Sequence, residues 1–164
     1  MRRRTLLTSV PVGLSIIAGC LDIGDDTDGS DDGVNEDVAA DAPAFAVDED
    51  APGAFTLLRI QPQEPGGVTD GDEFDIGVVL GNAGGEPVTG EADVELVPPT
   101  DDEAVQPATV VIDDELPSGA ARFFTTGPFE ATVPGDWELT AGSGIDRVHP
   151  EYDGTVAVGE RPED

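Results

Sequence analysis

The sequence predicts an all-β fold, an antiparallel β-sandwich of about seven strands, over residues 51–159. Apolar and polar residues alternate in short runs that recur about every ten residues, separated by glycine, proline and acidic turns. No stretch has the i, i+3, i+4, i+7 spacing of an amphipathic helix, and the 14 prolines fall too often for long helices. Alternating strands without crossover helices are typical of a sandwich.

The clearest strand is 72–80, in which Phe74, Ile76, Val78 and Leu80 share one face. The residues that follow this strand, Asn82-Ala83-Gly84-Gly85, predict a turn. In 136–141, we expect Trp137 to point into the core. The other predicted strands are 54–61, 91–97, 108–112, 120–125 and 155–158.

Residues 1–19 have the features of a cleaved signal peptide. Residues 2–4 are arginines, and the mostly apolar run 5–18 follows them. As a helix, those 14 residues would reach about 21 Å, short of the roughly 30 Å hydrocarbon core. We therefore expect export rather than a membrane-spanning anchor. Arg3, Arg4, Leu6 and Leu7 resemble the twin-arginine export signal, which implies export by that route.

Ile17-Ala18-Gly19-Cys20 resembles the lipobox of lipoprotein precursors. The resemblance implies cleavage before Cys20 and a lipid on that residue, which would hold the protein on the outer face of the cytoplasmic membrane, at the cell surface. Each buried methylene contributes about 0.8 kcal/mol, so two acyl chains give durable anchoring. Cys20 is the only cysteine, which excludes an intrachain disulfide.

The charge is strongly acidic, with 36 Asp and Glu against seven Arg, no Lys, and a formal net charge of -29. Nucleic-acid binding is excluded because it needs a basic surface. Carboxylates occur along the whole chain after Cys20, whereas an acidic interaction tail would confine them to one end. This composition resembles proteins of extreme halophiles, such as haloarchaea, and molar salt shortens the Debye length to about 3 Å. We expect the protein to be adapted to brine.

Residues 20–50 are expected to form a disordered acidic linker, and residues 160–164 a disordered tail. The linker contains one aromatic residue, Phe45, and cannot bury enough apolar surface to offset the entropy of ordering. Its Asp and Gly residues do not match the helix–loop–helix calcium motif. In the register that places Gly33 sixth, Ala39 occupies the twelfth position, where a glutamate is required.

Two segments resemble an immunoglobulin-like domain of prokaryotic surface proteins, the cell-adhesion-related CARDB type. One is 72–84, where a strand ends in an Asn-x-Gly turn, and the other is 134–141, where Gly135 precedes Trp137 and alternating apolar residues. The resemblance implies a non-catalytic adhesion, spacer or binding module.

We expect no enzyme and no cofactor or metal. His149 is the only histidine, and no lysine or second cysteine is present, so no nucleophile–base pair or two-histidine copper site can form. One tryptophan and one tyrosine are few for a glycosidase, which needs a sugar platform.

Phe123 and Phe124 are adjacent, so only one can face the interior of a strand. The outward ring either joins an interaction patch, for which Arg122, Phe124 and Phe129 are the candidates, or lies under the Gly127-Pro128 loop. The sequence thus predicts a lipid-anchored adhesion, spacer or protein-binding module whose protein partner is unknown. The alternative is an accessory subunit that docks on a membrane transport or respiratory complex, which an exposed apolar patch near 123–129 would favour.

Overall fold

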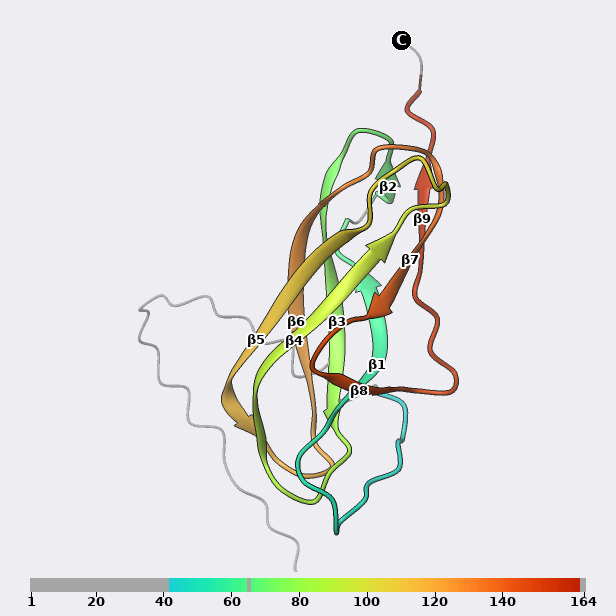
Figure 1. Cartoon of the computed structure of the whole chain (residues 1–164). Helices are drawn as coiled ribbons and strands as arrows, with labels where there is room; N and C mark the ends of the chain where they lie inside the picture. The colour runs from blue at the N-terminus through green and yellow to red at the C-terminus, as the bar shows by residue number, and fades with distance from the viewer. Residues whose placement is uncertain (1–41, 65, 163–164) are drawn as a thin grey trace, which may run out of the picture. The chain divides into compact units, whose positions relative to one another are not determined.

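The computed structural model describes residues 42–64 and 66–162, and in these the fold is a β-sandwich without helices (Figure 1). The strands are β1 (Phe55–Pro62), β2 (Val68–Thr69), β3 (Glu73–Asn82), β4 (Val88–Val97), β5 (Gln106–Leu116), β6 (Ala121–Glu130), β7 (Gly135–Ala141), β8 (Ile145–Val148) and β9 (Thr155–Gly159). One sheet has the order β6-β3-β1-β8 and the other β2-β9-β7-β4-β5. The all-β prediction is confirmed.

The seven predicted strands correspond to β1, β3, β4, β5, β6, β7 and β9, and most are longer than expected. β5 was expected to stop before Asp113, but it continues to Leu116. β5 is the edge strand of its sheet, so the side chains of Asp113, Asp114 and Glu115 near its end remain in solvent. β2 and β8 were not predicted. They form the two parallel pairs of the structure, β2–β9 and β1–β8, so the sandwich is not purely antiparallel.

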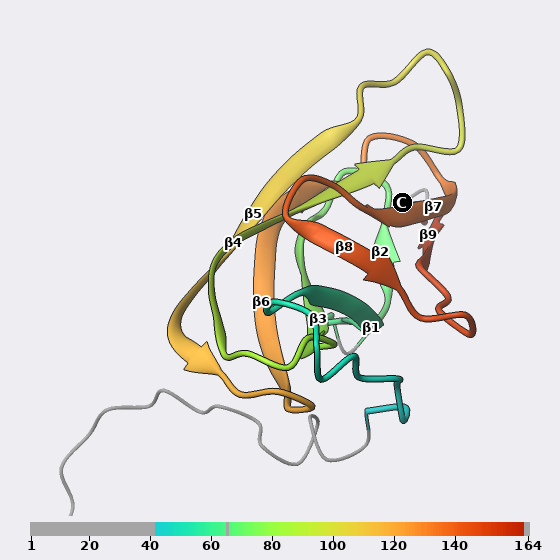
Figure 2. The same ribbon diagram turned by 60° about the horizontal axis from the view of Figure 1, so that its bottom comes forward.

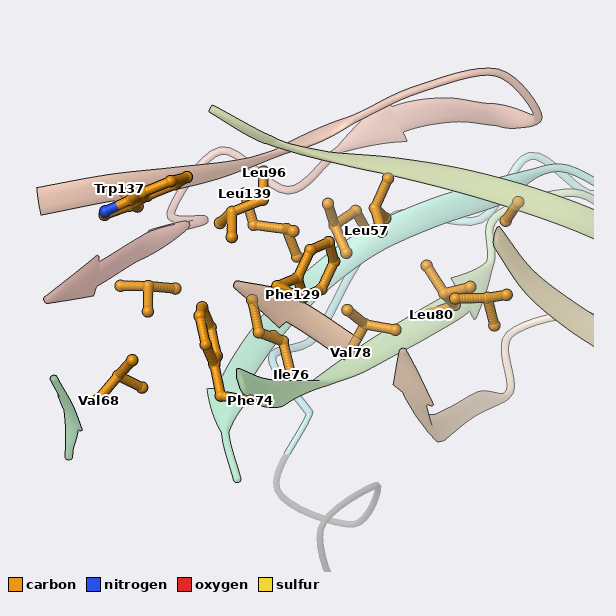
Figure 3. Close-up of a cluster of buried hydrophobic side chains, with 14 of the residues drawn as sticks. Leu57, Val68, Phe74, Ile76, Val78, Leu80, Leu96, Phe129, Trp137 and Leu139 are labelled. Carbon is orange, nitrogen blue, oxygen red and sulfur yellow. The ribbon is translucent and has the colours of Figure 1, made fainter. Parts of the chain in front are cut away.

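The core lies between the two sheets and contains the inward residues of both. Trp137 is fully buried, as predicted, and its indole N–H donates to the Val133 carbonyl oxygen at 3.0 Å. Figure 3 shows Trp137 and Leu80 at opposite ends of the cluster, with Phe129 between them. The rings of Phe74 and Phe129 pack with their centroids 6.0 Å apart.

The body begins before residue 51 and continues past residue 159, contrary to the predicted boundaries. The Asp48 N–H donates to the Ala83 carbonyl oxygen at 2.8 Å, so the last residues assigned to the linker are attached to the sandwich. On the other side, the Arg161 guanidinium lies 3.2 Å from a carboxylate oxygen of Asp72, which attaches the start of the predicted tail. Local composition did not reveal these contacts because their partners are distant in sequence.

Candidate functional site

Residues 42–47, which we call the strap, cross the outer face of the four-stranded sheet before the chain enters β1. Figure 2 shows this blue-green segment on the side of β1 away from β4. The Phe45 ring lies over Gly81, since a Cβ added there would be 2.7 Å from Phe45 Cζ. Glycine in β3 therefore provides the space in which the strap packs.

The outer face beneath the strap is apolar. Phe55 and Leu57 point into the core, so Thr56, between them, points outward, yet it is buried. Leu58, Val79 and Ala83 are also buried without belonging to the core cluster between the sheets. This face is thus covered by chain rather than exposed to water.

Two hollows lie beside the strap, and His149 lines both of them. The first has a volume of about 570 Å³ and is lined by Ala44, Phe45, Ala46, Thr56, Ala83, Arg147, Val148, His149 and Pro150. The second has a volume of about 450 Å³ and is lined by Pro43, Leu58, Arg59, Ile60, Pro62, His149, Glu151, Asp153 and Thr155. We call the two together the His149 groove.

His149 holds the strap against the end of β8. Its Nδ1 accepts the Glu151 N–H at 3.2 Å, and its Nε2 lies 3.1 Å from the Ala44 carbonyl oxygen. An Nδ1 that accepts and an Nε2 that donates together describe the neutral imidazole with its proton on Nε2. The backbone N–H of His149 also donates to the Leu57 carbonyl oxygen at 2.9 Å, which fixes the residue beside β1.

The two hollows differ in charge. Among the described residues, no carboxylate lines the first hollow, and its charged residue is Arg147. The second contains Arg59 together with Glu151 and Asp153. Hydrogen bonds from the side chain and the backbone N–H of Thr155 lower the pKa of Asp153, so this carboxylate stays ionised to lower pH than an ordinary aspartate.

The predicted interaction patch of Arg122, Phe124 and Phe129 is not a surface patch. Phe129 is only 1% exposed and belongs to the core. Phe124 is half-buried and packs against the same core. The physical reason is a register shift opposite Phe74 and Ile76, where β6 has one extra residue and its inward parity changes.

Arg122 and Phe123 make contacts that differ from those predicted from the sequence. The Arg122 guanidinium faces the Asp114 and Glu115 carbonyl oxygens of β5, at 3.3 and 3.4 Å, and so braces the edge between the two sheets. The outward ring is Phe123, but it covers Gly77 of β3 rather than lying under the Gly127-Pro128 loop, because a Cβ at Gly77 would be 2.3 Å from Phe123 Cε2.

The predicted export signal, Arg3, Arg4, Leu6 and Leu7, and the predicted lipobox, Ile17-Ala18-Gly19-Cys20, lie outside the residues that the structure describes. Within the described ranges, no group of three or more His, Cys, Asp or Glu residues could hold a metal ion. In the same part of the chain, no helix has the length and hydropathy needed to cross a membrane.

Apart from His149, the residues that line the groove were not singled out from the sequence. Arg147 and Val148 lie on β8, which was not predicted, and Phe45 lies in the stretch assigned to the linker. The alternation of Pro43, Phe45 and Val47 was the available signal for the strap, since all three are more buried than Ala44 and Ala46. No protein-family model, curated protein or solved structure matches the chain.

Proposed function

We propose that this chain is a non-catalytic lipoprotein of the cell surface, anchored through Cys20, whose sandwich binds another protein at the outer face of the cytoplasmic membrane. The observation that supports binding over a pure spacer role is the first hollow of the His149 groove. A spacer needs only a soluble acidic surface, whereas the described lining of this hollow combines apolar residues with an arginine and contains no carboxylate.

The alternative, an accessory subunit that docks through the region 123–129, has less support. Docking there requires exposed aromatic rings. Phe129 is buried in the core, and Phe124 packs against it, so these two rings are not available to a partner.

The anchoring part of the proposal is tested by Cys20→Ser in the native host. We expect the wild-type protein in the membrane fraction and the variant in the medium or the soluble fraction, because the acyl chains provide the membrane affinity. Retention of Cys20→Ser on membranes, after washing in molar salt, would contradict lipid anchoring.

The export route is tested by changing Arg3 and Arg4 to lysine. The double variant should accumulate inside the cell as an uncleaved precursor. Arg2→Lys is the matched control, because it keeps the charge and lies outside the pair. Equal export of both variants would contradict the twin-arginine route.

The binding part is tested by chemical crosslinking of intact cells at native salt. A specific, reproducible protein partner is expected with the anchored wild-type chain. If no protein is crosslinked above the level of an unrelated lipoprotein, the binding role is wrong and the spacer role replaces it.

A further inference from the structure

The first hollow of the His149 groove is a cationic spot on a very acidic protein. β1 and β8 run parallel with Thr56 opposite Arg147, so the two side chains lie on the same, outer face of the sheet. Both line the first hollow. The formal net charge of -29 makes a hollow whose described lining contains an arginine and no carboxylate unusual here.

Arg147 has no partner within the described residues, although acids are abundant there. Each of the other arginines in this part of the chain is engaged: Arg161 pairs with Asp72, Arg122 faces two carbonyl oxygens of β5, and Arg59 also has a partner. The Arg147 guanidinium is exposed and forms no hydrogen bond or ion pair with any described group. It therefore remains available to a ligand.

We propose that the His149 groove binds an extended segment of the partner protein, in which a carboxylate pairs with Arg147 and neighbouring apolar side chains pack on Phe45 and Val148. The inference rests on the protein-binding role proposed above and specifies its site. A guanidinium forms strong paired hydrogen bonds with a carboxylate, which makes this the natural anion for Arg147.

The shape of the site favours an extended peptide over a small molecule. Both hollows are open to solvent, and His149 lines both of them. Small-ligand sites enclose most of their ligand, whereas an open groove beside an extended chain suits a peptide. The strap is itself an extended segment held on this face through Phe45 and one bond from His149, so the surface already accommodates such a chain.

The charges also set the orientation of the peptide. Its carboxylate belongs in the first hollow, because Glu151 and Asp153 in the second would repel it. The apolar contacts provide most of the affinity, since an exposed ion pair contributes only about 0–1 kcal/mol. Phe45 is the aromatic contact, and Val148, which pairs with the inward-facing Leu57 and is 45% accessible, lines the edge of the hollow.

A direct test uses the full mature chain in detergent micelles at 2 M KCl, which screens the long-range repulsion between acids. The probe is a fluorescent eight-residue peptide, blocked at both ends, in which Val alternates with Ser except for a single Asp near one end, and the control peptide has Ser in place of that Asp. We expect saturable binding of the Asp peptide to the wild-type protein. The affinity for the Ser peptide should be at least threefold lower. Arg147→Gln should remove the difference between the two peptides.

The matched control variant is Arg122→Gln, because Arg122 lies on β6, away from the groove. It should leave the preference for the Asp peptide unchanged. Equal binding of both peptides to the wild-type protein, no binding of either, or a preference that survives Arg147→Gln would overturn the proposed site.

A second test identifies the site in cells and separates it from the proposed function. A photo-crosslinking amino acid is placed at Val148 or, as control, at Val111, which is 53% exposed on β5 of the other sheet. We expect capture from Val148 of a partner peptide with Asp or Glu within three residues of the crosslink, lost on Arg147→Gln.

Capture from Val111 but not from Val148 would overturn the groove and leave the protein-binding role intact. Capture from Val148 that is insensitive to Arg147→Gln would reject the carboxylate contact. If neither position captures a protein and chemical crosslinking also fails, both the site and the proposed function are wrong.

Discussion

The side-chain amide of Asn82 donates to the Leu116 carbonyl oxygen at 2.9 Å and so joins the end of β3 to the end of β5, in opposite sheets. Asn82 is fully buried, and its amide nitrogen also donates to the Glu86 carbonyl oxygen at 2.7 Å. Its Oδ1 accepts the Ala54 and Gly84 N–H groups at 3.2 and 2.9 Å. One side chain therefore satisfies four backbone groups at the end of the sandwich.

Asn82→Ala should lower the free energy of unfolding by about 3 kcal/mol, because it leaves four backbone groups without their partner. Asn82→Asp should cost more, since a carboxylate cannot donate to the Leu116 and Glu86 carbonyl oxygens and lies against them. Urea unfolding in molar salt, followed by Trp137 fluorescence, measures both.

The control for this prediction is Gln106→Ala. The Gln106 side chain also joins the sheets, with Nε2 2.7 Å from the Glu130 carbonyl oxygen and Oε1 2.8 Å from the Glu130 N–H. These bonds are exposed, so water replaces them and the loss should be about 1 kcal/mol or less. An equal loss for Gln106→Ala and Asn82→Ala would contradict the role assigned to burial.

Gly84→Ala should lower the melting temperature by more than about 8 °C, corresponding to a loss of several kcal/mol. A Cβ at Gly84 would lie 1.8 Å from the Pro52 carbonyl oxygen, so the backbone before β1 would have to move. Gly66→Ala is the matched control, because a Cβ there meets nothing within 4 Å. Differential scanning calorimetry at fixed salt compares the two; a stable Gly84→Ala would show that the turn tolerates displacement.

Transfer from 2 M to about 0.1 M KCl should destabilise the fold, because carboxylate repulsion is screened less as the Debye length grows to about 10 Å. The exposed ion pair Arg161–Asp72 offers little compensation. Changing Asp113, Asp114 and Glu115 of β5 to Asn, Asn and Gln should reduce the salt dependence. A melting temperature that does not change with salt would refute the adaptation to brine.

The carboxyl of Asp72 should titrate below the ordinary aspartate pKa of 3.8, chiefly because the Thr69 hydroxyl and N–H donate to it, with a smaller contribution from Arg161. Since folding lowers this pKa, the stabilisation is present above pH 3.8 and disappears as the pH falls through the folded value. Thr69→Val should raise the midpoint more than Arg161→Gln. The carboxyl ¹³C chemical shift of Asp72, followed against pH, measures this midpoint. A larger increase for Arg161→Gln than for Thr69→Val would assign the main effect to the ion pair.

The core could be predicted because alternation along β3 and β7 reports directly which face is buried. Phe74, Ile76, Val78 and Leu80 all point inward, and so does Trp137. The error at Phe129 has a local cause. Period two holds from Phe124 to the buried Thr126, but the extra residue of β6 before Phe129 returns that ring to the core. The extra residue falls at Gly127-Pro128, residue types that interrupt strand pairing, but the position of the shift relative to Phe74 and Ile76 is set by the pairing with β3.

The groove could not be predicted because its residues contact one another across long sequence distances. Ala44 meets His149 from 105 residues away. β8 is short and mostly exposed, so Ile145-Asp146-Arg147-Val148 has almost no amphipathic signal. Phe45 was assigned to the linker because its neighbours are acidic and small. The space over Gly81 in which its ring packs exists only in the folded chain.

The strap has a mechanical consequence, because a pull from the N-terminal side of residue 42 reaches it before any strand. The load would break the His149–Ala44 contact, lift Phe45 from Gly81 and then strip the Asp48 bond, one after another. β1, paired on both sides by β3 and β8, would be stressed only afterwards. Tension from that side would therefore detach and extend the strap before it loads the strands of the sandwich.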